Sequence, residues 1–299
     1  MRTADQEWPP LRVAAAARRL FGDSSATARD SRLPAFFADL AAPYRLAYDD
    51  RAWQAGRGQS YAEMCQPLVE ALVTDDRPID LVVLAYDLHD LRPGQATSVL
   101  LSHLCPGEPL ALTVCDQGTA AVFTALRLIQ TYARAGQARR ALLLTAEQAA
   151  VPYQLPEPVS LPSRQAAVGL LLSDEPGWQL GPVRQQPGVA ADRAGALLAE
   201  ELAGAGSADQ TVLLGSGLPA GTPSCLPAAE VIEPVSGQPA TAAWWELVAK
   251  LTEHRDSGRQ LVVADYEPRL RYLSTVTAVH TREAQRPREA QPDGVLAGG

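Results

Sequence analysis

The stretch Leu110–Glu147 constrains the fold of this chain most strongly, because it predicts a complete strand–turn–helix–strand unit. The apolar run Leu110–Val114 is short enough for a buried strand. After a polar turn, apolar residues recur at three- and four-residue spacing over Thr119–Ala135, which is typical of a helix with one buried face. Gly136 supplies the left-handed residue with which many helices end, and Ala141–Thr145 predicts a second strand. The chain is therefore expected to be an α/β protein, and the turn before its helix is the first place to look for chemistry.

Further helix and strand signals flank this unit on both sides. Helices are predicted over Tyr61–Val73 (with Ser60 as its N-cap), Thr97–Leu104, Asp192–Ala203 and Ala240–Leu251. Strands are predicted over Leu11–Ala17, Ile79–Tyr86, Ala166–Leu172, Trp178–Pro187, Thr211–Leu214, Gln260–Ala264 and Leu273–Val279. The continuous apolar run at Ile79–Tyr86 is typical of a parallel sheet covered on both faces. Residues 22–32 and 151–164 have the composition of loops, and 33–60 should hold at most one short helix.

The order of these elements repeats. A helix, a polar turn and a buried strand occur at Tyr61–Tyr86 and again at Asp192–Leu214, and a second such pair occurs at Thr119–Thr145 and Ala240–Ala264. Two similar α/β halves packed together would account for a chain of 299 residues. We expect one half in residues 1–175 and the other in 176–280, followed by a disordered tail over 281–299.

Composition excludes several classes of function. The net charge is −8, which argues against nucleic acid as the main partner. No apolar run approaches the length of a membrane span, and the N-terminus lacks the apolar core of a signal peptide, so we expect a cytoplasmic protein. The four cysteines form no C-x-x-C pair, and no metal cluster or phosphate-binding loop appears, so no metal or cofactor is expected.

Several local strings resemble the thiolase-fold ketosynthases, and specifically their ketoacyl synthase III branch. IDLVVLAYD (79–87) is similar to the family's strand before the substrate entrance, and TALRLIQTYARAGQARRALLLTAE (124–147) to its nucleophile helix and following strand. RQAAVGLLLSDE (164–175) resembles the D-G-A-G-A-A-V-L strand, with Gln165 where the aspartate usually stands, and SGQPATAAWW (236–245) resembles the G-N-T-S-A-A-S segment. The resemblance covers roughly residues 60–280 and implies a thiolase-like fold whose duplicated halves form five layers, α-β-α-β-α.

The family's catalytic triad is cysteine, histidine and asparagine, with the cysteine at a helix N-terminus where the dipole favours a thiolate. Matched without gaps through the helix, the cysteine position falls on Thr119. The histidine position falls on Ser216 and the asparagine position on Gln238. The family's C-terminal glycine triplet corresponds to Glu267-Pro268-Arg269. The resemblance thus implies that all three catalytic positions have been replaced.

Cys115 offers an alternative nucleophile. CDQGTAAVFTAL (115–126) resembles the C-Y-G-G-T-A-A-V-F-N-A string of hydroxymethylglutaryl-CoA synthases, whose cysteine is the nucleophile. Its spacing to the next strand is longer by four residues than in the ketosynthases, and cysteine is often simply buried. Thr119 can equally be a helix cap, and Ser216, between two glycines, a turn residue. His89 and His103 could supply a base or be structural.

Ketosynthase-fold proteins build paired subunits, and some pairs combine an active with a degenerate member. The chain resembles the inactive small subunit of the alkylquinolone-forming synthase heterodimer. The first hypothesis is therefore a non-catalytic ketoacyl synthase III-like subunit that partners an active homologue in acyl transfer or condensation of a secondary-metabolite pathway. A homodimer is the alternative assembly, and an acyl carrier protein is a further candidate partner. The alternative is a stand-alone acyltransferase that uses Cys115 on a CoA or phosphopantetheine thioester. A third hypothesis is a binding module that retains an acyl-pantetheine pocket without chemistry.

Overall fold

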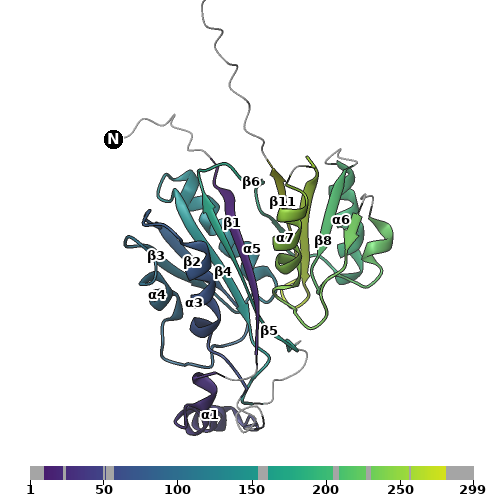
Figure 1. Cartoon of the computed structure of the whole chain (residues 1–299). Coiled ribbons are helices and arrows are strands. Elements are labelled where there is room, and N and C mark those ends of the chain that lie inside the picture. Colours follow the sequence, from purple (N-terminus) through teal and green to yellow (C-terminus); the bar gives the residue numbers. More distant parts are fainter. Residues whose placement is uncertain are drawn as a thin grey trace, which may run out of the picture.

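The computed structural model describes residues 10–22, 25–49, 51, 57–153, 161–204, 209–226, 230–255 and 257–280 (Figure 1). Its strands are β1 (Arg12–Phe21), β2 (Leu81–Ala85), β3 (Leu110–Val114), β4 (Arg140–Glu147), β5 (Gln165–Ser173), β6 (Trp178–Leu180), β7 (Arg184–Gln186), β8 (Gln210–Leu214), β9 (Glu230–Ile232), β10 (Gln260–Glu267) and β11 (Tyr272–His280). Its helices are α1 (Leu33–Ala41), α3 (Tyr61–Leu72), α4 (Thr97–Ser102), α5 (Ala120–Arg134), α6 (Ala191–Gly204) and α7 (Ala242–Glu253). No helix in these ranges is long and apolar enough to cross a membrane.

The strand order shows the duplication directly. The first five strands are ordered β3-β2-β4-β5-β1, and the later ones β9-β8-β10-β11. In each set the second strand is parallel to both of its neighbours, and the third is antiparallel to the fourth. The short strand β6 joins the two sets by pairing with both β1 and β11.

Helices and sheets alternate in five layers. One hydrophobic cluster lies between the two sets of strands and contains the buried faces of α5 and α7, whose Phe123 and Trp244 rings are 5.0 Å apart. A second cluster packs α3 against the outer face of the first set, and a third packs α6 against the outer face of the second. Figure 1 shows α5 and α7 in the middle, with α3 and α4 outside one sheet and α6 outside the other. The expected α-β-α-β-α arrangement is therefore confirmed.

Local signals in the sequence account for most element boundaries. Ser60 and Glu63 form a reciprocal capping box at the start of α3, as the Ser60 N-cap predicts. Gly136 follows α5 with a φ of 68°, which suits a glycine after a helix. Residues 33–60 contain α1, the short helix allowed for there, while β9 carried no signal strong enough to be predicted.

Two expectations were wrong. Leu110–Val114 forms a strand, but β3 is an edge strand that pairs only with β2 among the described strands, so Leu110 is 45% exposed. Trp178–Pro187 is not one strand, because Gly181 and Pro182 separate β6 from β7, and proline cannot donate to a strand ladder. Residues 154–160 of the expected loop and the expected tail at 281–299 lie outside the described residues.

Candidate functional site

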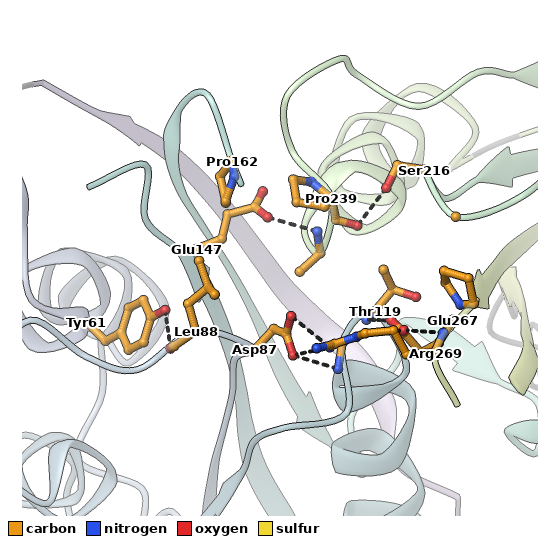
Figure 2. Close-up of a pocket in the computed structure, with 14 residues that line it drawn as sticks. Tyr61, Asp87, Leu88, Thr119, Glu147, Pro162, Ser216, Pro239, Glu267 and Arg269 are labelled. Carbon is orange, nitrogen blue, oxygen red and sulfur yellow. Dashed lines mark hydrogen bonds and ion pairs between the residues drawn. The ribbon is translucent and has the colours of Figure 1, made fainter. Parts of the chain in front are cut away.

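A cavity of about 240 Å³ lies where the N-termini of α5 and α7 meet the ends of β4 and β10 (Figure 2). It draws residues from both halves of the chain. Its lining consists of Tyr61, Asp87, Leu88, Gly118, Thr119, Glu147, Pro162, Ser216, Gly217, Pro239, Ala240, Glu267, Pro268 and Arg269. The position where the resembling family carries its nucleophile is thus in this cavity, which makes it the candidate site.

Two carboxylates occupy the N-terminus of α5. Glu267 Oε2 accepts a hydrogen bond from the backbone N–H of Thr119 at 2.9 Å, and Asp87 Oδ1 accepts one from the N–H of Gly118 at 2.9 Å. These are amides that a helix N-terminus otherwise leaves without partners, and the helix dipole favours negative charge at this place. Gly118 permits the approach, since its φ is 53° and a Cβ there would lie 1.7 Å from Glu267 Oε2. The electropositive end of α5 is therefore already filled by the chain's own carboxylates.

Arg269 links the two carboxylates. Its Nη2 lies 2.8 and 3.1 Å from the two oxygens of Asp87, and its Nε lies 3.3 Å from Glu267 Oε1. The backbone N–H of Arg269 also donates to Glu267 Oε1 at 3.0 Å. Figure 2 shows the guanidinium lying beside both carboxylates. Asp87, Glu267 and Arg269, called the α5 cap below, form a charge-paired unit in which Glu267 is only 3% exposed.

The N-terminus of α7 is capped in the same way from the other half. Glu147, the last residue of β4, accepts hydrogen bonds from the N–H of Ala240 at 2.8 Å and from the N–H and hydroxyl of Thr241. Glu267 is likewise the last residue of β10. Each half thus ends its central strand on a glutamate that caps the central helix of the other half. Burial raises the pKa of Glu147 to about 7, against the lowering effect of these hydrogen bonds.

Asp265 adds a third buried carboxyl behind the cavity wall. Burial raises its pKa to about 7, although it accepts hydrogen bonds from the N–H groups of Tyr266 and Gly217 at 2.7 and 3.1 Å. The turn after β8 comes so close that a Cβ on Gly215 would lie 1.9 Å from the carboxyl carbon of Asp265. This contact explains the glycine at 215, and a Cβ on Gly217 would lie 1.7 Å from the backbone oxygen of Tyr266, which explains the second glycine beside Ser216.

Thr119 lies at the expected place but does not cap the helix with its side chain, so the prediction of a threonine cap is wrong. Its backbone is already helical, and its hydroxyl makes no capping hydrogen bond. The Oγ1 atom is buried and forms no hydrogen bond with a described residue. It lies near Asp265, and its effect on that carboxyl opposes part of the increase in pKa that burial causes. The capping role falls to Asp87 and Glu267 instead.

Ser216 and Gln238 lie near Thr119 but do not form a triad with it. Ser216 lines the cavity, and its hydroxyl donates to the backbone oxygen of Pro239 at 3.0 Å. Gln238 is buried behind the wall, where its amide donates to Thr241 Oγ1 at 3.1 Å, and Thr241 in turn donates to Glu147. None of the histidines in the described part of the chain is in the lining.

Cys115 lies outside the cavity. It follows β3, and its thiol donates to Asp116 Oδ2 at 3.3 Å. Burial, the hydrogen bond to Asp116 and the charges of Asp116 and Asp87 all raise the pKa of this thiol. A nucleophilic cysteine needs its pKa lowered, so this environment disfavours the thiolate.

The residues that dominate the site, Glu147, Glu267, Asp87 and Arg269, were not predicted as functional. A signal for two of them was present, because the Thr-Ala-Ala strings at 119–121 and 241–243 each precede a strand that ends in glutamate. Aligning the two halves would have singled out Glu147 and Glu267. No group of three or more metal-binding side chains occurs in the described ranges.

No protein-family model matches the chain, and no curated protein matches it in sequence. Solved structures do match. ChlB3, described as an acyltransferase, is 19% identical with a TM-score of 0.59, over 91% of this chain and 98% of its own. AbyA1, a tetronic acid condensing enzyme, is 17% identical with a TM-score of 0.60, over 90% and 99%. The 3-oxoacyl-(acyl carrier protein) synthase III of Xanthomonas oryzae is 12% identical with a TM-score of 0.59, over 92% and 100%.

At these identities the likeness establishes the fold. Together with the duplicated strand order and the five layers, it shows that the chain has the thiolase fold.

Proposed function

We propose that this chain is a non-catalytic ketoacyl synthase III-like subunit that completes an active homologue carrying out acyl transfer or condensation. The observation that carries the proposal is the α5 cap. A thiolate at the N-terminus of α5 would draw its stabilisation from amides and a dipole that Glu267 and Asp87 now use. Two carboxylates beside that position would also raise the pKa of any thiol placed there.

The named structural neighbours support the chemistry of the complex. They are described as an acyltransferase, a tetronic acid condensing enzyme and a 3-oxoacyl-(acyl carrier protein) synthase. We infer that the active partner works on acyl thioesters of CoA or of an acyl carrier protein, and that this chain contributes structure to that partner.

The edge strand β3 is our candidate for the surface that meets the partner. One side of β3 has no strand partner among the described strands, and Leu110 on it is 45% exposed. Val99 and Leu104, in and just after the adjacent α4, are 44% and 42% exposed. An edge strand with apolar side chains around it favours pairing with a second chain. A homologue with the same fold would present a matching edge.

Co-expression with a cysteine-bearing homologue tests the proposal. The expected result is a stable heterodimer whose condensing or acyl-transfer activity exceeds that of the homologue alone. Leu110→Lys should prevent association while the chain still folds, whereas Val279→Lys, on the distant strand β11 and 36% exposed, should leave association unchanged. A chain that stays monomeric beside a homologue that is fully active alone would contradict the proposal.

The alternative, a stand-alone acyltransferase that uses Cys115, makes a different prediction. Incubation with an acyl-CoA would then leave an acyl group on the chain, and Cys115→Ala would abolish it. The raised pKa of the Cys115 thiol and its place outside the cavity favour the non-catalytic proposal.

A further inference from the structure

A second cavity, of about 260 Å³, shares no lining residue with the candidate site. The end of β1, the chain after β4 and the start of β5 surround it. Its lining consists of Leu20, Phe21, Arg57, Ala149, Ala150, Ser163, Arg164 and Gln165. Pro162 lines the first cavity and Ser163 the second, so the two cavities are neighbours across this segment.

Two arginines bring positive charge to the described lining of this cavity. Arg57 and Arg164 are both exposed, and neither forms an ion pair with any residue that the structure describes. Among the described residues, no aspartate or glutamate is in the lining. A third arginine, Arg19, lies next to it, with its guanidinium 5.4 Å from the centre of the Phe21 ring.

The chain is acidic overall, with a net charge of −8, and several of its arginines are ion-paired, as Arg77 is with Glu175 and Arg139 with Asp174. Unpaired guanidinium groups around a concave surface provide several N–H donors in fixed planes, which is the arrangement that suits phosphate oxygens.

Gln165 keeps the floor of the cavity neutral. It is 4% exposed, and its Nε2 donates to the backbone oxygen of Gly22 at 3.2 Å. Its Oε1 is buried without a hydrogen-bond donor among the described residues. A carboxylate at this position would bring negative charge to the cavity, whereas the neutral amide leaves the charge of the arginines unopposed there.

We propose that this second cavity is a binding site for a phosphate group, either free phosphate or the phosphate of a small ester, held by Arg57 and Arg164 above Gln165. The site does not depend on the proposed function, because it shares no lining residue with the cavity at α5. Arg57 and Arg164 would donate to the phosphate oxygens from opposite parts of the chain, and Gln165 would keep the wall behind them uncharged.

Isothermal titration calorimetry on the full chain tests the site, with inorganic phosphate and glycerol 3-phosphate as the two probes and sodium chloride holding the ionic strength constant. We expect saturable binding of at least one probe. Stronger binding of inorganic phosphate would identify free phosphate as the ligand, and stronger binding of the ester would identify a phosphorylated small molecule.

Variants connect the binding to the named residues. Arg57→Ala and Arg164→Ala should each weaken binding about tenfold, the usual size of one lost charge-assisted hydrogen bond. Arg127→Ala, an exposed arginine on α5, should bind as the wild type does. Gln165→Glu should abolish binding, and a thermal melt will show whether it folds. The proposal is overturned if neither probe binds saturably. It is also overturned if the variant that combines Arg57→Ala and Arg164→Ala binds the probes as tightly as the wild type does.

Discussion

The carboxylate of Glu267 lies 2.9 Å from the backbone nitrogen of Thr119, although 148 residues separate the two in sequence. This hydrogen bond joins the end of β10 in one half to the start of α5 in the other. Glu147 makes the equivalent contact with Ala240 at the start of α7, at 2.8 Å. The two contacts tie the halves together reciprocally, and the first of them involves Thr119, the residue that the family resemblance matches to the nucleophile of the ketosynthases.

A cysteine introduced at the nucleophile position should therefore remain unreactive. In a background with Cys115→Ser and Cys225→Ser, we expect Thr119→Cys to give a thiol whose pKa lies above the ordinary value of about 8.5, because Glu267 and Asp265 disfavour negative charge there. Adding Glu267→Gln should lower that pKa by about one unit. The measurement is the pH dependence of alkylation by iodoacetamide, followed by mass spectrometry. If the thiol of Thr119→Cys reacts rapidly at neutral pH while Glu267 is still present, this interpretation of the site is wrong.

The α5 cap should contribute measurably to stability. Arg269→Ala removes the cation between Asp87 and Glu267 and leaves Glu267, which is 3% exposed, with less compensation. We expect a loss of about 1–3 kcal/mol in the free energy of unfolding, measured by urea denaturation. The control is Arg127→Ala, an exposed residue on α5 that should change it by less than about 0.5 kcal/mol. Equal effects of the two substitutions would show that the guanidinium bridge carries no stability.

Gly118 should tolerate no side chain, for a reason beyond its backbone angle. Gly118 has a φ of 53° and Gly188 one of 71°, so alanine is strained at both. Only at Gly118 would the new Cβ meet the Glu267 carboxylate, whereas Gly188 has no heavy atom within 4 Å of that position. Gly118→Ala should therefore cost at least about 1 kcal/mol more than Gly188→Ala in urea denaturation. Similar costs would mean that Glu267 moves aside freely.

Because the pKa of Glu147 is raised in the folded chain, the free energy of unfolding should decrease as the pH rises. The pKa of Glu147 is raised from 4.5 to about 7 in the folded chain, so over this window the folded state binds a proton that the unfolded state releases. Its stabilising contribution is complete below about pH 4.5 and is lost as the pH rises through about 7. Relative to wild type, Glu147→Gln should gain on the order of 3 kcal/mol between pH 4.5 and pH 8.

The measurement is the free energy of unfolding at several pH values. Glu70→Gln, at an exposed position on α3, is the matched control. Its free energy of unfolding should change with pH in the same way as that of the wild type. Asp265, whose pKa is also raised to about 7 by burial, contributes with the same sign and remains in both variants. If the free energy of unfolding of Glu147→Gln also changes with pH as that of the wild type does, Glu147 ionises in the folded chain as readily as in water.

Most helices and strands could be predicted from the sequence, because hydrophobic periodicity is a local property, whereas the five-layer arrangement was expected from the family resemblance. The helix at Thr119–Ala135 and the strand at Ala141–Thr145 could be predicted from their own residues, and the repeated order of such units indicated the duplicated halves. Edge position is not local: the run Leu110–Val114 is as apolar as a central strand, and only the sheet order shows that it lies at the edge.

The site was harder to predict than the fold. Thr119 and Ser216, which the resemblance assigns to the family's cysteine and histidine positions, line the same cavity. The resemblance could not show what replaced the missing chemistry, since Asp87 is 182 residues from Arg269 in sequence and meets Arg269 only through the packing of the two halves. Only the structure shows that carboxylates fill the helix N-terminus.

The most direct test of the central claim is intact-mass spectrometry of the wild-type chain after incubation with an acyl-CoA. The account predicts an unchanged mass, because the cavity at α5 holds carboxylates in place of a nucleophile and the thiol of Cys115 is disfavoured as a thiolate. A stoichiometric acyl adduct that disappears in Cys115→Ala or Thr119→Ala would contradict it and identify the chain as an acyltransferase in its own right.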